Sequence, residues 1–434
     1  MNILIVSSES WRDTNNGGNV LSNIFSCFPD ACIAQIYCSG ELPQNSVCRK
    51  YFQIADTMLL TRKKGRALEE RFYGEETSAQ PEAAENKIKS RIPHFLRDFF
   101  LLAREFLWTV SDWKTKDLEQ FVSDFRPDII FAPCYAYFHV SKLALHVKHI
   151  ANCPMISYIS DDNYSLKQLN PAPSFWINRL ITRKWIRRHF AESALVYTMT
   201  DLQKQEYEAL LKRPMKILCK AAEFSAPEKR EGDTVRLIYA GGLYLNRWKM
   251  LSKLAEAVAE INRTETKAEL HIYSGSKLKS RQSQKLDDGK NSFLHDGIPY
   301  RELMERYRKS DIAVHTESFD LKNRLITRLS FSTKIIDCMS SGCAILAIGP
   351  CTQAGISYLK ENDAAVCVDN TEDLYGAVGK LVEDRMLIWT YADKAYRLGM
   401  RNHCRENIEK SVRRDFCDVI AEYGKDIKQR AERL

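Results

Sequence analysis

The sequence predicts an α/β protein with two Rossmann-like domains that face each other across a cleft. A buried-strand pattern at residues 3–6 is followed by a loop with a glycine pair at 17–18 and then by a helix. The same order returns about half a chain later, where a strand at 235–240 precedes the glycine pair at 241–242. Strand, glycine-containing loop and helix form the opening unit of a dinucleotide-type fold. Two such units, separated by a polar linker at 222–234, therefore indicate two domains.

Length and composition bound the class of protein. The chain has 434 residues, which is long for one ordinary domain and enough for two cores. With 44% apolar and 28% charged residues, it has the composition of an ordinary folded protein. The net charge of +8 is mild for this length. Such a charge fits anionic small ligands or an anionic membrane surface, and it does not indicate a nucleic-acid partner.

The cysteines and the apolar runs indicate the cellular compartment of the protein. The 13 cysteines are scattered and never form a C-x-x-C arrangement, which argues against a disulfide framework or a zinc site and fits a reducing cytosol. The apolar run at 3–6 is too short for a signal peptide, and no stretch approaches the length of a membrane-spanning helix. We therefore expect a cytoplasmic protein.

The first half alternates strands with helices. After the opening strand we expect strands at 31–37, 129–132, 154–159 and 195–199, and helices at 20–25, 140–150 and 175–190. Asp161 and Asp162 directly follow the strand at 154–159. Because ligands bind at the carboxyl ends of strands in open α/β sheets, we expect this pair to bind a ligand hydroxyl. A plain turn and a magnesium site remain open as alternatives.

An amphipathic stretch at 95–122 follows the early strands. Its stripe at helical spacing comprises Phe95, Phe99, Leu102, Phe106 and Trp113, with basic residues among them. Packing in the core is the favoured interpretation of such a stripe. The alternative is a helix that lies on an anionic membrane surface, together with the basic helix at 175–190.

The second half repeats the alternation. We expect strands at 235–240, 270–273, 312–315, 343–348 and 364–368, and helices at 248–262, 300–309 and 374–384. The predicted domains are 1–225 and 235–395. A charged helical tail at 396–434 follows, which could pack back on the first domain.

The stretch from Ser332 to residue 348 predicts a cap, a short helix, a glycine stop and a buried strand. Ser332 is a suitable N-cap, and Gly342 can end the helix in the left-handed conformation. Thr333 and Asp337 share one face of that helix. Free amides at the helix start can hold a phosphate, and a carboxylate one turn deeper can bind sugar hydroxyls. This pattern is common in α/β proteins, so a solvated surface acid at Asp337 is the alternative.

Two cations follow the second glycine pair. Arg247 and Lys249 lie at the start of the predicted helix, which is the unfavourable end of the helix dipole for a positive charge. Their position is explained if they face an anion such as a diphosphate, with Arg as a bidentate donor and Lys as a point charge. Two solvated surface cations are the alternative.

Four motifs of the second half occur in a characteristic order. The glycine pair with Arg247 and Lys249 comes first, followed by DGIPYREL at 296–303, SDIAV at 310–314 and STKIIDCMSSG at 332–342. In this order and spacing the set resembles GT-B glycosyltransferases, in particular the retaining family that makes bacterial surface polysaccharides. The resemblance covers about 235–370 well and the first half only in outline.

The resemblance implies a role for each matching residue. Arg247 and Lys249 would bind the donor diphosphate and carry catalysis. Asp337 would bind the ribose hydroxyls, where the family usually has Glu. The implied donor site is completed by Gly242, Ser332, Thr333 and Lys334, with Gly17 and Gly18 approaching the donor phosphate from the first domain. Asp161 and Asp162 would bind the acceptor.

This chain departs from the family at one acidic position. The first of the family's two glutamates would fall on Leu329, and the segment 318–331 is longer than usual. Glu317 or Asp320, at the end of the preceding strand, is the expected substitute. This departure leaves open which residue binds the sugar of the donor.

We therefore expect an enzyme that transfers a sugar from a nucleotide-sugar donor to a saccharide or lipid-linked acceptor. Cations and helix amides stabilise a departing diphosphate without a metal, so we expect no metal and no cofactor. A retaining outcome follows from the resemblance alone. A sugar-nucleotide epimerase and a catalytically silent nucleotide-sugar-binding scaffold are the alternatives. An anionic membrane is a candidate partner, at the inner face of the plasma membrane.

Overall fold

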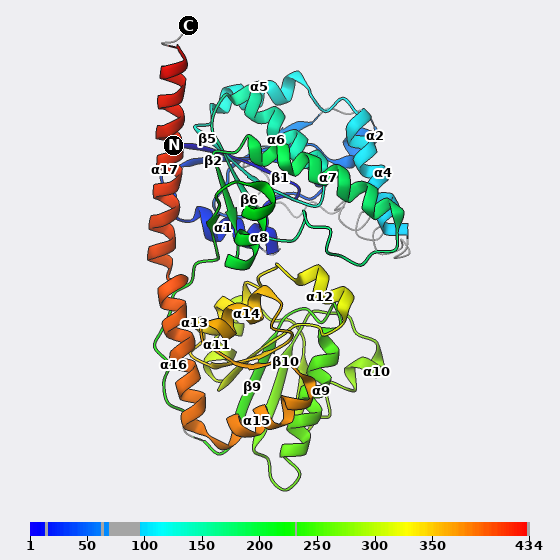
Figure 1. Cartoon of the computed structure of the whole chain (residues 1–434), viewed down its shortest axis with the longest axis vertical. Coiled ribbons are helices and arrows are strands. Elements are labelled where there is room, and N and C mark those ends of the chain that lie inside the picture. Colours follow the sequence, from blue (N-terminus) through cyan, green and yellow to red (C-terminus); the bar gives the residue numbers. More distant parts are fainter. Residues whose placement is uncertain (14–15, 62–64, 69–95, 231, 432–434) are drawn as a thin grey trace. The chain divides into compact units, whose positions relative to one another are not determined.

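The computed structural model describes residues 1–13, 16–61, 65–68, 96–230 and 232–431, and Figure 1 shows their course. The chain divides into two compact units. Unit 1 comprises Met1–Leu218 together with Glu409–Leu434, and unit 2 comprises Cys219–Ile408. The chain therefore passes between the units twice, and the predicted linker at 222–234 lies within unit 2 rather than between the units.

Unit 1 is built on an eight-stranded sheet. The strand order is β4-β3-β2-β1-β5-β6-β7-β8, and every neighbouring pair is parallel except β3 with β4. The strands are β1 Asn2–Ser7, β2 Cys32–Tyr37, β3 Lys50–Gln53, β4 Arg66–Leu68, β5 Ile129–Pro133, β6 Met155–Ile159, β7 Leu195–Thr198 and β8 Lys216–Ile217. The central strands are unbroken apolar runs, because parallel strands in such folds are buried on both faces.

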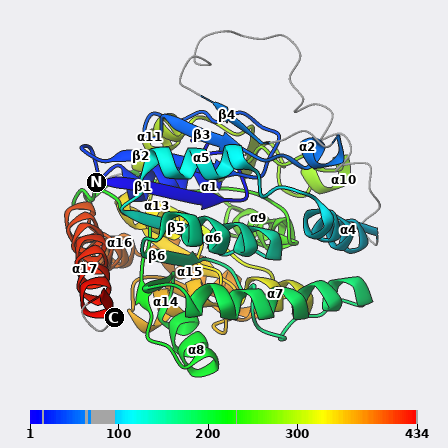
Figure 2. The same cartoon turned by 90° about the horizontal axis from the view of Figure 1, so that it is seen from above.

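The helices of unit 1 connect these strands. They are α1 Asn16–Phe25, α2 Asp56–Leu60, α4 Arg97–Val110, α5 Lys116–Phe125, α6 Phe138–Ala151, α7 Pro173–Ala191 and α8 Asp201–Leu211. The hydroxyls of Thr115 and Thr200 accept hydrogen bonds from the first turns of α5 and α8, which fixes where these helices begin. Figure 2 shows the same elements from above.

The first glycine pair lies in a different element from the one expected. Gly17 and Gly18 belong to the first turn of α1 and not to a loop before it. A Cβ on Gly18 would lie 2.0 Å from the carbonyl oxygen of Arg12, so this position accepts no side chain without a backbone shift. A close backbone contact is therefore one reason for a glycine at Gly18.

Helix α17, Arg405–Ala431, continues from unit 2 into unit 1. The ring of Phe416 is fully buried, with its centroid 5.0 Å from that of Phe28 and 6.1 Å from that of Phe25. The preceding residue, Asp415, accepts hydrogen bonds from the Tyr197 hydroxyl at 2.7 Å and from Lys216 Nζ at 2.5 Å. The end of the chain thus supplies part of the core of unit 1.

Unit 2 contains a six-stranded, fully parallel sheet of order β11-β10-β9-β12-β13-β14. The strands are β9 Val235–Ala240, β10 Ala268–Tyr273, β11 Ser292–His295, β12 Ile312–Thr316, β13 Ala344–Ile348 and β14 Val366–Val368. The helices are α9 Arg247–Ile261, α10 Ser280–Ser283, α11 Tyr300–Arg308, α12 Leu321–Thr327, α13 Lys334–Ser340, α14 Ala354–Glu361, α15 Leu374–Glu383 and α16 Arg385–Asn402, with a 3₁₀ turn at Thr371–Asp373. The prediction of an α/β protein with two Rossmann-like domains is confirmed.

In the part of the chain that the structure describes, no helix is both long enough and apolar enough to span a bilayer.

We predict that Phe416→Ala destabilises unit 1, because a buried aromatic side chain that touches two other rings leaves a cavity when it is truncated. The expected loss is about 3–5 kcal/mol of unfolding free energy, measured by urea denaturation. Asp418→Ala, on the exposed side of the same helix, is the control and should change this energy by less than about 0.5 kcal/mol. Equal effects of the two substitutions would contradict the role of Phe416 in this core.

Candidate functional site

The candidate donor site lies in unit 2, in the loops that follow β9 and β12 at the carboxyl edge of the sheet. Its first element is the glycine pair after β9. A Cβ on Gly241 would lie 2.8 Å from Cε of Lys334, so the absence of a side chain lets the lysine lie against the loop. Gly242 is equally restricted, because a Cβ there would lie 2.1 Å from the ring of Tyr244.

The loop then adopts two consecutive left-handed residues. Leu245 has φ 56° and Asn246 has φ 63°. A left-handed leucine is an uncommon conformation that costs about 1–2 kcal/mol. The surrounding contacts hold it in place: Asn323 Nδ2 donates to the Leu245 carbonyl at 3.0 Å, and Asn246 Nδ2 donates to Asp320 Oδ2 at 2.7 Å. Both partners belong to the segment 318–331, which the sequence marked as unusually long.

Arg247, the first residue of α9, forms a buried ion pair with Glu317 at the end of β12. Its Nη2 lies 2.7 Å and 2.9 Å from the two carboxylate oxygens, and its Nε lies 3.3 Å from Oε2. The side chains are only 11% and 9% exposed. Burial disfavours the charged guanidinium, but the Glu317 carboxylate outweighs this effect and raises the pKa of Arg247. A cation at this helix start is thus explained in part by its own carboxylate partner.

Lys249 lies in the first turn of the same helix and is much more accessible. Its side chain is 46% exposed, and its ammonium lies 3.8 Å from Asp320 Oδ2, which is a weak surface pair. Hydrogen bonds from Asn246 and Ser318 lower the pKa of Asp320 and keep it charged. Lys249 is therefore the cation of this pair that can turn toward a ligand at little cost.

The short helix α13 begins later than expected. Thr333 occupies the N-cap position and makes no side-chain cap, so the prediction that Ser332 caps the helix is wrong. The carbonyl of Ser332 accepts from the Ile335 amide at 3.0 Å and closes the first turn instead. Lys334 is the first helical residue. The Lys334 side chain lies against Gly241 and also interacts electrostatically with Glu317, so its ammonium lies beside the loop that follows β9.

Asp337 is buried, which contradicts the alternative of a solvated surface acid. Its Oδ1 accepts from Lys220 Nζ at 2.6 Å and from the Tyr300 hydroxyl at 3.0 Å. The Lys220 ammonium also lies 5.1 Å from the centre of the Tyr300 ring. Lys220 could not be recognised as a partner from the sequence, because it lies far from Asp337 along the chain. A ribose-binding role for Asp337 stays a prediction, and these contacts fix the orientation of its carboxylate.

The position of the missing family glutamate is a core position. Leu329 is fully buried, and an unpaired carboxylate at a buried position would be costly. Glu317 is the buried acid that faces the cations of this region, whereas Asp320 is 43% exposed and holds the loop after β9. His315, two residues before Glu317, is buried, and burial lowers the pKa of its imidazole to about 3.

The two predicted acceptor residues of unit 1 have different surroundings. Asp161 is exposed, whereas Asp162 is buried and accepts from the Ser165 amide at 2.9 Å and the Tyr207 hydroxyl at 3.1 Å. Asp162 therefore holds its own turn together, and Asp161 is the member of the pair that can reach a ligand. In the part of the chain that the structure describes, no three His, Cys, Asp or Glu side chains gather as a metal site would require.

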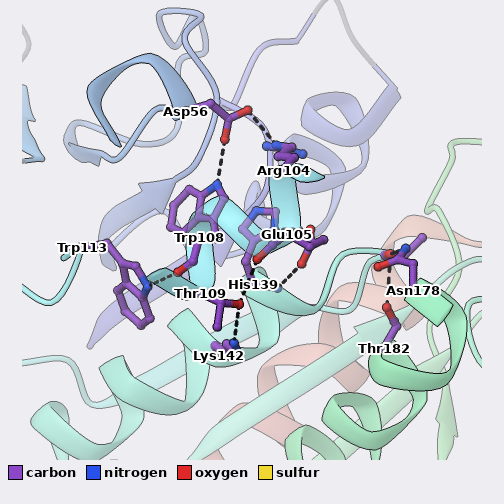
Figure 3. A network of polar contacts seen from close by, with 11 residues as sticks. Asp56, Arg104, Glu105, Trp108, Thr109, Trp113, His139, Lys142, Asn178 and Thr182 are labelled. Atoms are coloured by element: carbon purple, nitrogen blue, oxygen red, sulfur yellow. Dashed lines mark hydrogen bonds and ion pairs between the residues drawn. The ribbon is translucent and has the colours of Figure 1, made fainter. Parts of the chain in front are cut away.

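A polar network in unit 1 was not expected from the sequence (Figure 3). His139 donates its backbone amide to Glu105 at 2.9 Å, and its Nδ1 lies 2.6 Å from the same carboxylate. Trp108 stacks on the imidazole at 4.5 Å and donates to Asp56 at 2.7 Å. Burial lowers the pKa of His139, although Glu105 opposes the shift. This network fastens α4 to the start of α6.

Part of unit 2 matches a family of known proteins. Residues 234–384 match the family model described as "Glycosyl transferases group 1". The chain carries a group 1 glycosyltransferase domain. That domain contains every donor-site residue of unit 2 discussed above except Lys220. The search of curated proteins found no match.

Solved structures confirm the GT-B fold. The chain resembles Anabaena HepE in complex with UDP, with a TM-score of 0.63 and 11% identity over 96% of this chain and 100% of that one. It also resembles sucrose-phosphate synthase from Thermosynechococcus elongatus, with a TM-score of 0.61 and 11% identity over 97% and 99% of the two chains. For the trehalose 6-phosphate synthase from Burkholderia multivorans, the TM-score is 0.60 and the identity 11%, over 99% and 98%. Together with the match of residues 234–384 to the family model, this confirms the prediction of a glycosyltransferase.

We predict that Glu317→Ala lowers the free energy of unfolding by about 3–5 kcal/mol, because it leaves the Arg247 guanidinium buried without a counter-charge. The combined substitution Arg247→Met with Glu317→Leu should recover most of this loss, since it removes both charges. Both effects can be measured by chemical denaturation.

The matched control is Glu305→Ala on the exposed face of α11, which should change stability by less than about 0.5 kcal/mol. If Glu317→Ala were no more destabilising than this control, the ion pair would not be a stabilising element of the site.

Proposed function

We propose that the protein transfers a sugar from a nucleotide-sugar donor to a saccharide or lipid-linked acceptor, with retention at the anomeric carbon and without a metal. The observation that carries the proposal is that Lys334 lies against the glycine loop of the group 1 domain, and that this loop leads directly into Arg247 and Lys249 at the start of α9. Such a cluster suits a diphosphate, which needs several positive charges and close backbone approach. The retaining outcome rests on the resemblance of the motifs alone.

The three cations support this chemistry because, with a donor bound at this loop, they would lie near the departing diphosphate. When the bond between the anomeric carbon and the phosphate oxygen breaks, the electron pair leaves with the diphosphate. Preorganised cations stabilise that charge more in the transition state than in the ground state. Arg247 is held by its ion pair with Glu317, whereas Lys249 is 46% exposed and Lys334 lies against Gly241. In this proposal the three side chains stabilise the leaving diphosphate without a divalent cation.

The donor and the pathway belong to the same proposal. The similar HepE structures contain UDP, UDP-glucose, or UDP with glucose, which supports a nucleotide-sugar donor for this chain. We assign the protein to surface polysaccharide or glycoconjugate synthesis, at the cytoplasmic side of the membrane, on the strength of the motif resemblance. Gly17 and Gly18 stay predicted donor contacts, and Asp161 stays a predicted acceptor contact.

Two other functions make different predictions. A sugar-nucleotide epimerase on the same scaffold would release a free epimer without any acceptor. A silent nucleotide-sugar binder would be stabilised by a nucleoside diphosphate yet transfer nothing to any acceptor panel. The substitution of the family glutamate by Leu329 is the feature that favours the silent binder.

A thermal-shift screen identifies the nucleotide. We predict that one nucleoside diphosphate raises the melting temperature, because a ligand that binds only the native state stabilises it by mass action. The matching nucleoside should give a much smaller shift, since it lacks the groups that the cations bind. No shift with any nucleoside diphosphate would contradict donor binding as such.

We further predict that Lys249→Ala lowers the rate of sugar transfer by about 10²–10³-fold, the usual loss when one charge-stabilising donor is removed. The measurement is release of nucleoside diphosphate from the nucleotide sugar that the screen selects. Lys253→Ala, one turn further along α9 and also exposed, is the matched control and should keep full activity. Unchanged turnover in both Lys249→Ala and Arg247→Lys would end the assignment.

A further inference from the structure

Helix α4 exposes an apolar stripe along its whole length. The exposed fractions are 36% for Leu96, 58% for Phe99, 48% for Phe100, 66% for Phe106 and 63% for Val110. The opposite side of the helix buries Glu105 and Trp108 in the network described above. The expectation that this aromatic stripe packs in the core is therefore wrong for Phe99 and Phe106, whereas Trp113 is buried as expected and Phe95 lies outside the described residues.

Helix α7 lies beside α4 and adds to the same kind of surface (Figures 1 and 2). Near its start, Ile177 is 50% and Leu180 57% exposed, and Leu169 in the preceding loop is 47% exposed. The loop is tied to α4 because Asn170 Nδ2 donates to Asp98 at 2.9 Å. We call the following exposed side chains the apolar face: Leu96, Phe99, Phe100, Phe106, Val110, Leu169, Ile177 and Leu180. Monomeric proteins rarely leave so many large apolar side chains together in water.

The cations of α7 fall into two groups. Arg179, Arg183 and Arg187 bond to the carbonyls of Asp162 and Tyr164 or to the Tyr164 hydroxyl, although Arg187 is itself exposed. Lys184 and Arg188 point outward and are exposed. The basic helix is thus partly structural, and only its outward cations are available to a partner.

Further positive charge borders the apolar face. Arg97 and Lys114 are exposed at the two ends of α4. Glu105 is buried against His139, whereas Asp98, which accepts from the neutral amide of Asn170, and the exposed Asp112 offset part of this charge. The apolar face is thus bordered by Arg97, Lys114, Lys184 and Arg188, with these two acids among them.

We propose that the apolar face with Arg97, Lys114, Lys184 and Arg188 docks on an anionic lipid bilayer. An amphipathic surface with aromatic side chains on one strip and cations beside it fits the boundary between head groups and acyl chains. The large side chains enter that boundary, and the cations pair with anionic head groups. This deepens the proposed function, since a lipid-linked acceptor would be presented at the same surface, but the binding itself does not depend on catalysis.

The test is flotation of the full-length protein with vesicles of phosphatidylglycerol and phosphatidylcholine in equal parts, compared with vesicles of phosphatidylcholine alone. We expect the wild type to float with the anionic vesicles and only weakly with the neutral ones. Phe99→Ser combined with Phe106→Ser should weaken binding about 100-fold, because two large side chains no longer enter the bilayer. Lys184→Glu with Arg188→Glu should weaken it at least about 25-fold, at about fivefold for each lost cation.

Matched controls lie in unit 2. Tyr375→Ser with Met386→Ser removes two apolar side chains that are 52% and 55% exposed, and Lys285→Glu with Lys290→Glu makes the same change in net charge. Both should bind vesicles like the wild type. Equal binding to neutral and anionic vesicles, or equal loss in the controls, would overturn the proposal.

Two further outcomes would also overturn it. If Phe99→Ser with Phe106→Ser lowers the melting temperature as a core substitution does, the strip is covered by another part of this chain. If the same variant abolishes self-association while vesicle binding is absent in the wild type, the face is a protein interface. Lys249→Ala should still bind vesicles, and the phenylalanine variant should still release nucleoside diphosphate in solution. Failure of docking and failure of catalysis are thus distinguishable.

Discussion

The buried ion pair between Arg247 and Glu317 is the interaction on which the candidate site depends. It joins the first residue of α9 to the end of β12, so it fixes two loops at one edge of the unit 2 sheet. Gly349, after β13, lies close to Glu317, because a Cβ built on this glycine would lie 3.1 Å from Glu317 Cβ. Because burying one of these charges alone would be costly, neither residue can be changed independently of the other.

The segment 318–331 explains how the loop before Arg247 keeps an unfavourable conformation. Leu245 and Asn246 are both left-handed, and they are held by side chains of Asn323 and Asp320. Strain of this kind persists only where the surroundings enforce it, and it is concentrated at functional sites. The segment 318–331 is therefore a structural support for the loop that leads into Arg247.

The sequence predicted the fold well and the site only in outline. Unbroken apolar strands and glycine-containing turns are local signals, so the two parallel sheets followed directly from the pattern. The partners of Asp337 and Arg247 are distant in sequence, and periodicity carries no information about such contacts. Periodicity also could not decide between core and surface for Phe99 and Phe106, because an apolar stripe looks the same whether its partner is this chain or another surface.

The central claim is that the cations around the Gly241 loop bind a diphosphate. The most direct measurement is calorimetric titration of the protein with a nucleoside diphosphate and with its nucleoside, repeated on Lys334→Ala. The account predicts that the diphosphate binds at least about 100-fold more tightly than the nucleoside, since two charge-assisted contacts contribute about 1.5–3 kcal/mol each. It also predicts that this advantage shrinks in the variant. Equal affinities, or an advantage that Lys334→Ala leaves unchanged, would contradict it.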